Sequence, residues 1–119
     1  MDEPITFDAV TIDCADPVAL AEFWGSVLGT EIEWTAGDGP HYIDLKAVSG
    51  APRLRFQRVP EPKPTKNRLH LDLFAADVAA AVARVEALGG SRIGSVAEYG
   101  FEWTVLADPE GNEFCIVPP

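Results

Sequence analysis

Residues 10–29 read VTIDCADPVALAEFWGSVLG, and this segment decides the fold. Its first residues alternate between apolar and polar side chains, which predicts a strand over Phe7–Cys14 with two unlike faces. Asp16-Pro17 then supplies an N-cap followed by proline at the first helical position. Apolar residues recur at helical spacing as far as Leu28, and Gly29 provides the C-terminal stop. A strand followed by an amphipathic helix is therefore expected here.

The same pattern returns about 60 residues later, where residues 71–90 read LDLFAADVAAAVARVEALGG. It predicts a strand over Arg68–Phe74 and a helix that begins at Asp77 and ends at Gly89-Gly90. Alternation places one aliphatic set under the two helices, namely Val10, Ile12, Leu69, Leu71 and Leu73. The polar set on the other face consists of Asp13, His70 and Asp72.

Three shorter strands are expected after each helix. The first group is Glu31–Trp34, His41–Lys46 and Arg53–Val59, and the second is Ser91–Ile93, Phe101–Leu106 and Glu113–Val117. These elements predict the α+β class, with two βαβββ modules in tandem inside one domain of residues 1–119. The halves cover about 1–59 and 68–119, and the connector 60–67, with three prolines, is expected to be extended.

Composition excludes several classes of protein. Hydrophobic residues make up 47% of the chain, which permits a sizeable core, but no stretch reaches the roughly 18 apolar residues of a membrane span. A net charge of −10 disfavours nucleic-acid binding. The acidic start, Met1-Asp2-Glu3-Pro4, lacks the features of a secretory signal, and Cys14 and Cys115 are expected to be reduced core thiols. We therefore expect a cytoplasmic protein without membrane or nucleic-acid partners.

Positive charge is unevenly distributed along the chain. Seven of the nine basic residues lie between Lys46 and Arg68. One interpretation is a solvated strand edge that discourages aggregation. The other is a local site for an anion or a partner.

The order of elements and two motifs resemble the vicinal oxygen chelate superfamily, which includes glyoxalases, bleomycin-resistance proteins and extradiol dioxygenases. The motifs are the first helix with its Phe23-Trp24 pair and the closing DPEGNEF of residues 108–114. FQRVPEPKP over 56–64 and KNRLHLD over 66–72 are similar to the small glyoxalase-like subgroup. The resemblance covers nearly the whole chain. It implies that each module curls its mixed sheet into a U-shaped cup, and that the chain forms a homodimer.

The resemblance also implies a divalent metal held by His and Glu side chains from four strands. The positions that correspond in this chain are Ala9, Gln57, His70 and Cys115. Ala9 has no donor, Gln57 is a weak neutral donor, and the apolar neighbours of Cys115 raise the pKa of its thiol. Only His70 matches in type and place, so we expect no metal cofactor.

The candidate site consists of polar and aromatic residues expected on the concave face of the sheet. His70 with Asp13 and Asp72 are candidate catalytic residues, because two carboxylates near an imidazole suit acid–base chemistry. Alternatively, the aspartates hydrogen-bond the backbone or pair with Arg55, Arg58 or Arg68, and His70 is a core histidine. The candidate ligand-binding residues are Trp34, Tyr42, Arg55, Gln57, Trp103 and Cys115. Core and dimer packing is the alternative role for these aromatics and for Tyr99 and Phe101.

The leading functional prediction is binding of a small organic ligand in the cup without a metal, in the manner of a bleomycin-resistance protein. The ligand is expected to have an aromatic or aliphatic body and a polar or anionic end. The main alternative is a glyoxalase-like lyase, isomerase or hydrolase that uses His70 with Asp13 or Asp72. A metal-free interaction module that uses the basic segment is a third possibility. Whether the chain is an enzyme stays open at this stage.

Overall fold

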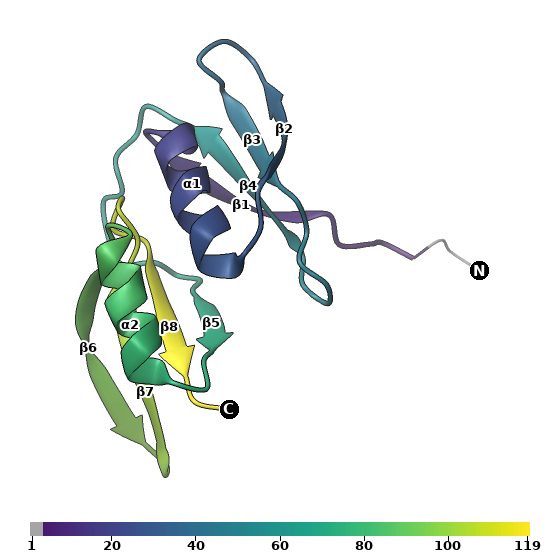
Figure 1. Cartoon of the computed structure of the whole chain (residues 1–119). Coiled ribbons are helices and arrows are strands. Elements are labelled where there is room, and N and C mark those ends of the chain that lie inside the picture. The colour runs from purple at the N-terminus through teal and green to yellow at the C-terminus, as the bar shows by residue number, and fades with distance from the viewer. Residues whose placement is uncertain (1–3) are drawn as a thin grey trace. The chain divides into compact units, whose positions relative to one another are not determined.

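The computed structural model describes residues 4–119, within which two helices and eight strands follow one another as β1-α1-β2-β3-β4 and then β5-α2-β6-β7-β8 (Figure 1). The chain divides into two compact units, residues 1–61 and 62–119. Both units have the order βαβββ, which confirms the predicted α+β class and the tandem modules. The boundary falls inside the predicted connector 60–67, which contains no helix or strand. The acidic residues Asp2 and Glu3, used above to predict the cellular location, lie outside the described residues.

Helix α1 (Pro17–Leu28) begins and ends where the sequence predicts. The carboxylate of Asp16 accepts a hydrogen bond from the backbone N–H of Ala19 at 3.2 Å, which satisfies one of the free donors of the first turn. Gly29 closes the helix with a φ of +68°, a conformation that glycine adopts without steric cost. The apolar side of the helix buries Leu20 and Trp24 almost completely.

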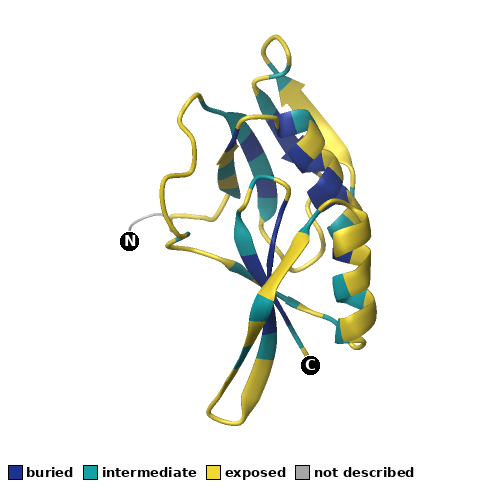
Figure 2. Ribbon diagram, turned by 90° about the vertical axis from the view of Figure 1, so that its left-hand side faces the viewer, coloured by how far each residue is buried: buried dark blue, intermediate teal, exposed yellow. Residues whose placement is uncertain are grey.

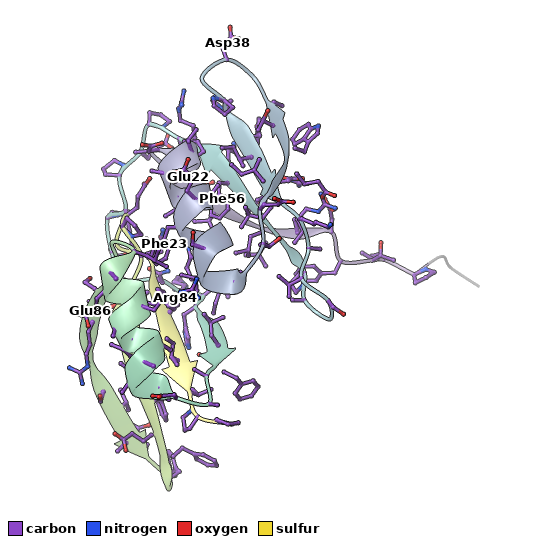
Figure 3. All side chains as sticks on the ribbon, viewed as in Figure 1. Glu22, Phe23, Asp38, Phe56, Arg84 and Glu86 are labelled. Atoms are coloured by element: carbon purple, nitrogen blue, oxygen red, sulfur yellow. The ribbon has the colours of Figure 1, made fainter. Side chains whose placement is uncertain are left out.

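The first unit contains a mixed sheet with the strand order β1-β4-β3-β2. Its strands are β1 (Ala9–Cys14), β2 (Ile32–Ala36), β3 (Tyr42–Leu45) and β4 (Arg53–Arg58). Strand β1 runs parallel to β4, and the other neighbours are antiparallel. Helix α1 packs on β3 and β4, where Ile43, Leu45 and Phe56 are buried (Figures 2 and 3). This face of the sheet is therefore the core of the first unit.

The opposite face of this sheet carries a network of ion pairs centred on Asp44. Residues paired in register share a face, and Asp44 lies opposite Arg55. Asp44 is only 3% exposed, and its carboxylate accepts hydrogen bonds from Arg55 Nε at 2.7 Å and from Arg53 at 3.2 Å. Arg55 also pairs with Asp8, and Arg53 with Glu33. The hydrogen bond from Arg55 is the main cause that lowers the pKa of Asp44, and Arg53 adds to it.

This network corrects two expectations about the basic segment. Strand β4 lies between β1 and β3, so Arg53 and Arg55 do not lie on a solvated sheet edge. Arg55 pairs with Asp44 and Asp8, whereas the sequence had offered Asp13 or Asp72 as its partner.

The second unit contains a mixed sheet with the strand order β5-β8-β7-β6. Its elements are β5 (Leu71–Phe74), α2 (Val78–Ala87), β6 (Ser91–Glu98), β7 (Phe101–Ala107) and β8 (Glu113–Val117). Asp77 caps α2 through the N–H of Ala80 at 3.0 Å, as predicted. In the turn before β8, buried Asp108 accepts hydrogen bonds from the N–H groups of Glu110 and Asn112. Neither helix of residues 4–119 is long and apolar enough to cross a membrane.

Two strands begin later than predicted, and the reason is the same in both units. Strand β5 begins at Leu71 opposite Phe114, and β1 begins at Ala9 opposite Arg53. Both are edge strands with one partner each, and the partner strands begin at Arg53 and Glu113, so in this register residues before Ala9 and before His70 have no strand opposite them. Leu69 is consequently 82% exposed and does not lie under α2, contrary to prediction. Strand β6 extends past Ile93 to Glu98 because it pairs with β7 through a tight turn, in which Tyr99 and Gly100 both have positive φ.

We predict that Asp44→Asn lowers the free energy of unfolding by about 2–4 kcal/mol at pH 7, because two arginines lose a buried charged partner. Since the folded-state pKa of Asp44 is lowered, its contribution is present above the ordinary value of 3.8 and is lost as the pH falls through the folded value. Urea denaturation at several pH values measures the difference. Asp38→Asn, in the exposed β2–β3 loop, is the control (Figure 3). A pH-independent loss, or an equal loss in the control, would contradict the assignment.

Candidate functional site

A cavity of about 540 Å³ lies in the second unit and is the main candidate for a functional site. Its apolar wall consists of Ile93, Val96, Trp103, Val105 and Val117. Its polar lining consists of Lys66, His70, Asp72, Ser95, Glu113 and Cys115. Along β8, Cys115 alternates with Phe114 and Ile116, which are buried on the face of the sheet that packs with α2. The cavity therefore lies on the sheet face away from α2, and we call it the unit-2 cavity.

Three of its polar residues form a close group at the β5–β8 pairing. Asp72 lies opposite Cys115 in the parallel register, and His70 lies immediately before β5. His70 Nε2 is 3.3 Å from Asp72 Oδ1, and one potential donor atom from each of the three side chains lies within 4.8 Å of the others. An imidazole paired with a carboxylate suits hydrogen bonding or proton transfer to a bound molecule.

Cys115 is held in its thiol form. Burial is the largest cause that raises the pKa of this thiol, followed by the negative charge of Asp72 and a hydrogen bond with it. Because the ordinary value is already 9.0, the side chain is protonated at neutral pH. Cys115 therefore contributes a small, polarizable, weakly polar surface to the cavity and is a poor nucleophile.

The two remaining charged residues of the lining neutralise each other. Lys66 Nζ lies 2.9 Å from Glu113 Oε1, and the side chain of Glu113 is 22% exposed whereas that of Lys66 is 76% exposed. The hydrogen bond from Lys66 is the main cause that lowers the pKa of Glu113. Glu113 is therefore ionised at neutral pH, and its charge is compensated by Lys66.

The structure brings together four of the predicted site residues, namely His70, Asp72, Trp103 and Cys115, in the unit-2 cavity. The other five lie in the first unit, on the sheet face away from α1, and are Asp13, Trp34, Tyr42, Arg55 and Gln57. Gln57 on β4 is paired with Asp13 on β1 and with Tyr42 on β3. Arg55 donates a hydrogen bond to the carboxylate of Asp44. The predicted roles of these five residues in ligand binding or catalysis stay predictions.

Sequence reasoning missed several residues of the sites. Lys66 and Glu113 are 47 positions apart, and Asp44 stands between two apolar residues in a short strand. Glu113 could have been found because it is two positions from Cys115 in the same strand and so shares its face. Asp44 could have been found because a carboxylate inside an apolar strand needs a cation to pair with. Tyr99 and Phe101, considered as wall residues, lie at the β6–β7 turn, are 94% and 70% exposed, and do not line the unit-2 cavity.

The four positions that correspond to the superfamily's metal ligands do not form a matching donor set. Ala9 offers no donor, and Ala9 and Gln57 lie in the first unit, whereas His70 and Cys115 lie in the second. Within residues 4–119, one group of His, Cys, Asp or Glu side chains is close enough to hold an ion, and it consists of His70, Asp72 and Cys115. Closed zinc sites have four donors, whereas this group offers three, one each from a histidine, an aspartate and a cysteine. These residues do not fit the four-ligand His/Glu site.

Comparisons with known proteins agree on the fold. The sequence profile of the glyoxalase-like domain matches residues 9–117. No curated protein matches the chain in sequence. A glyoxalase/bleomycin resistance protein/dioxygenase family enzyme from Burkholderia phytofirmans PsJN is similar in structure, with a TM-score of 0.75, 23% identity, and coverage of 93% of this chain and 96% of that one.

Two further solved structures are similar in the same way. A glyoxalase-related enzyme from Fulvimarina pelagi has a TM-score of 0.71 and 20% identity, covering 96% of this chain and 88% of that one. The lactoylglutathione lyase from Agrobacterium tumefaciens has a TM-score of 0.66 and 19% identity, covering 98% and 96%. At these identities the likeness extends to the fold, and activity has to be argued from the site.

Proposed function

Because this chain belongs to the glyoxalase-like domain family of the vicinal oxygen chelate superfamily, we propose that it binds a small organic ligand in the unit-2 cavity without a divalent metal. The observation that carries the proposal is the cavity itself. Its volume of about 540 Å³ lies within the range of about 300–1,000 Å³ that is typical of small-molecule sites. Its apolar wall and few converging polar groups are also typical of such sites.

Each part of the cavity has a role in this proposal. Trp103 and the valines beside it contact the body of the ligand, because burial of apolar surface supplies most of the affinity of such sites. His70 and Asp72 hydrogen-bond its polar end and fix its orientation. No step of this binding requires a metal.

One observation favours the enzymatic alternative, and it is the His70–Asp72 pair. A carboxylate beside an imidazole orients the ring for proton transfer, as general acid–base chemistry in a lyase, isomerase or hydrolase requires. Turnover of a bound compound that is lost in His70→Ala would favour catalysis over binding alone. An interaction module built on residues 46–68 has less support, because Arg53, Arg55, Arg58, Lys63 and Lys66 all donate hydrogen bonds within the chain.

We further propose a cytoplasmic homodimer. Buried free thiols at Cys14 and Cys115 are compatible with a reducing compartment. Phe74 on edge strand β5 is 78% exposed, and a second chain would cover such a surface.

We predict that His70→Ala weakens ligand binding by about 1–3 kcal/mol, because a polar contact in the cavity is lost. The ligand would come from a fragment screen read by changes in the NMR signals of Trp103, and calorimetry would measure its affinity. The melting temperature should change little, since the His70 side chain is 50% exposed. His41→Ala, the other histidine of the chain, is the matched control and should leave affinity unchanged. Unfolding of His70→Ala with unchanged affinity in the folded fraction would show a purely structural histidine.

We predict that zinc, nickel or manganese does not raise the melting temperature and that a chelator does not lower it. A metal present at 100 times its dissociation constant would stabilise the chain by ~2.7 kcal/mol, which corresponds to several degrees for a domain of this size. Such an increase, abolished in His70→Ala but retained in His41→Ala, would overturn the metal-free proposal.

We predict that sedimentation analysis at tens of micromolar protein finds a dimer. Phe74→Ser, a polar replacement on the exposed edge, should shift the population toward monomer. Only monomer in the unaltered protein would refute the dimer.

A further inference from the structure

The charges that line the unit-2 cavity do not cancel. Lys66 and Glu113 neutralise each other at 2.9 Å. Asp72 remains, with one oxygen beside His70 and a side chain that is 60% exposed. With histidine counted as neutral, these groups carry one net negative charge.

The charges of the surrounding unit are also negative on balance. Residues 62–119 contain five basic and eight acidic side chains, so the second unit is negative as a whole. Lys63, three positions before Lys66, donates a hydrogen bond to the carbonyl of Thr65 at 2.6 Å, and Arg68, two positions after Lys66, is exposed and does not line the cavity. An anionic ligand would therefore share Lys66 with Glu113 and be repelled by Asp72, whereas a cation would be attracted by the Asp72 carboxylate and leave that pair intact.

The apolar wall suits a positive charge as well. Trp103 lines the same cavity as Asp72, and an indole face attracts ammonium and guanidinium groups through its quadrupole. Val96, Val105 and Val117 offer surface for an uncharged body beside it. We infer that the unit-2 cavity selects ligands that carry a protonated amine on an aromatic or aliphatic body. This inference rests on the proposed ligand-binding function and names its substrate class.

The test uses three probes that share one ring system and differ in charge: tryptamine, a cation; tryptophol, which is neutral; and indole-3-acetate, an anion. Their affinities are measured by NMR titration of the indole N–H signal of Trp103, identified with Trp103→Phe. Tryptamine should bind about 5-fold more tightly than tryptophol and at least about 10-fold more tightly than indole-3-acetate at low salt. The preference should shrink as ionic strength rises.

Two variants locate the charge that is responsible. Asp72→Asn keeps the size of the side chain and removes its charge, so it should weaken tryptamine about 5-fold and tryptophol much less, because the amide can still hydrogen-bond a hydroxyl. Glu86→Gln removes an exposed carboxylate from α2, outside the cavity lining, and should change neither probe (Figure 3).

The outcomes separate the inference from the proposed function. Equal affinity for tryptamine and tryptophol, unaffected by Asp72→Asn, would overturn the charge preference and leave ligand binding in place. Tightest binding of indole-3-acetate would overturn it in favour of an anion site. If none of the probes shifts the Trp103 signal, the inference fails together with the assignment of the cavity as a binding site for such compounds.

Discussion

The position of β8 in the middle of its sheet is the constraint on which the unit-2 cavity depends. Because β8 pairs with β5 on one side and β7 on the other, its alternation fixes the faces of all three strands. Burial of Phe114 and Ile116 on the α2 side leaves Cys115 on the opposite face, where the register places Asp72 beside it. A slip of one residue would exchange the two faces and remove the site.

Local signals were sufficient to predict the helices and most strands. An N-cap aspartate and a closing glycine act over a few residues, and both helices begin and α1 ends where the sequence indicates. The first residues of β1 and β5 could not be predicted from local signals, because they depend on where a partner strand distant in sequence begins. Leu69 matches a strand pattern but has no facing residue, so it is exposed.

Charge pairing was the least predictable part of the sites. A sequence shows how many charged residues there are, but the ion pairs form between residues that are distant in sequence. Arg55 pairs with Asp44, and Lys66 pairs with Glu113. The cluster of basic residues between Lys46 and Arg68 suggested an anion site. In the folded chain three of the seven, Arg53, Arg55 and Lys66, form ion pairs with carboxylates, and Lys66 is the one member that lines the cavity. The alternation rule, by contrast, placed His70 and Asp72 on the face away from the helix, and both line the cavity.

The Asp44 network has a consequence for how the two modules tolerate mutation. A buried carboxylate held by two guanidinium groups ties the integrity of the first module to a few side chains, so substitution there would act on folding before function. Around the unit-2 cavity, His70 and Asp72 are half-exposed and contribute little to the core. Their replacement should therefore leave the fold intact. The duplicated architecture thus separates a module in which substitution of the buried charges acts on folding from one whose half-exposed polar side chains can be exchanged without unfolding the chain.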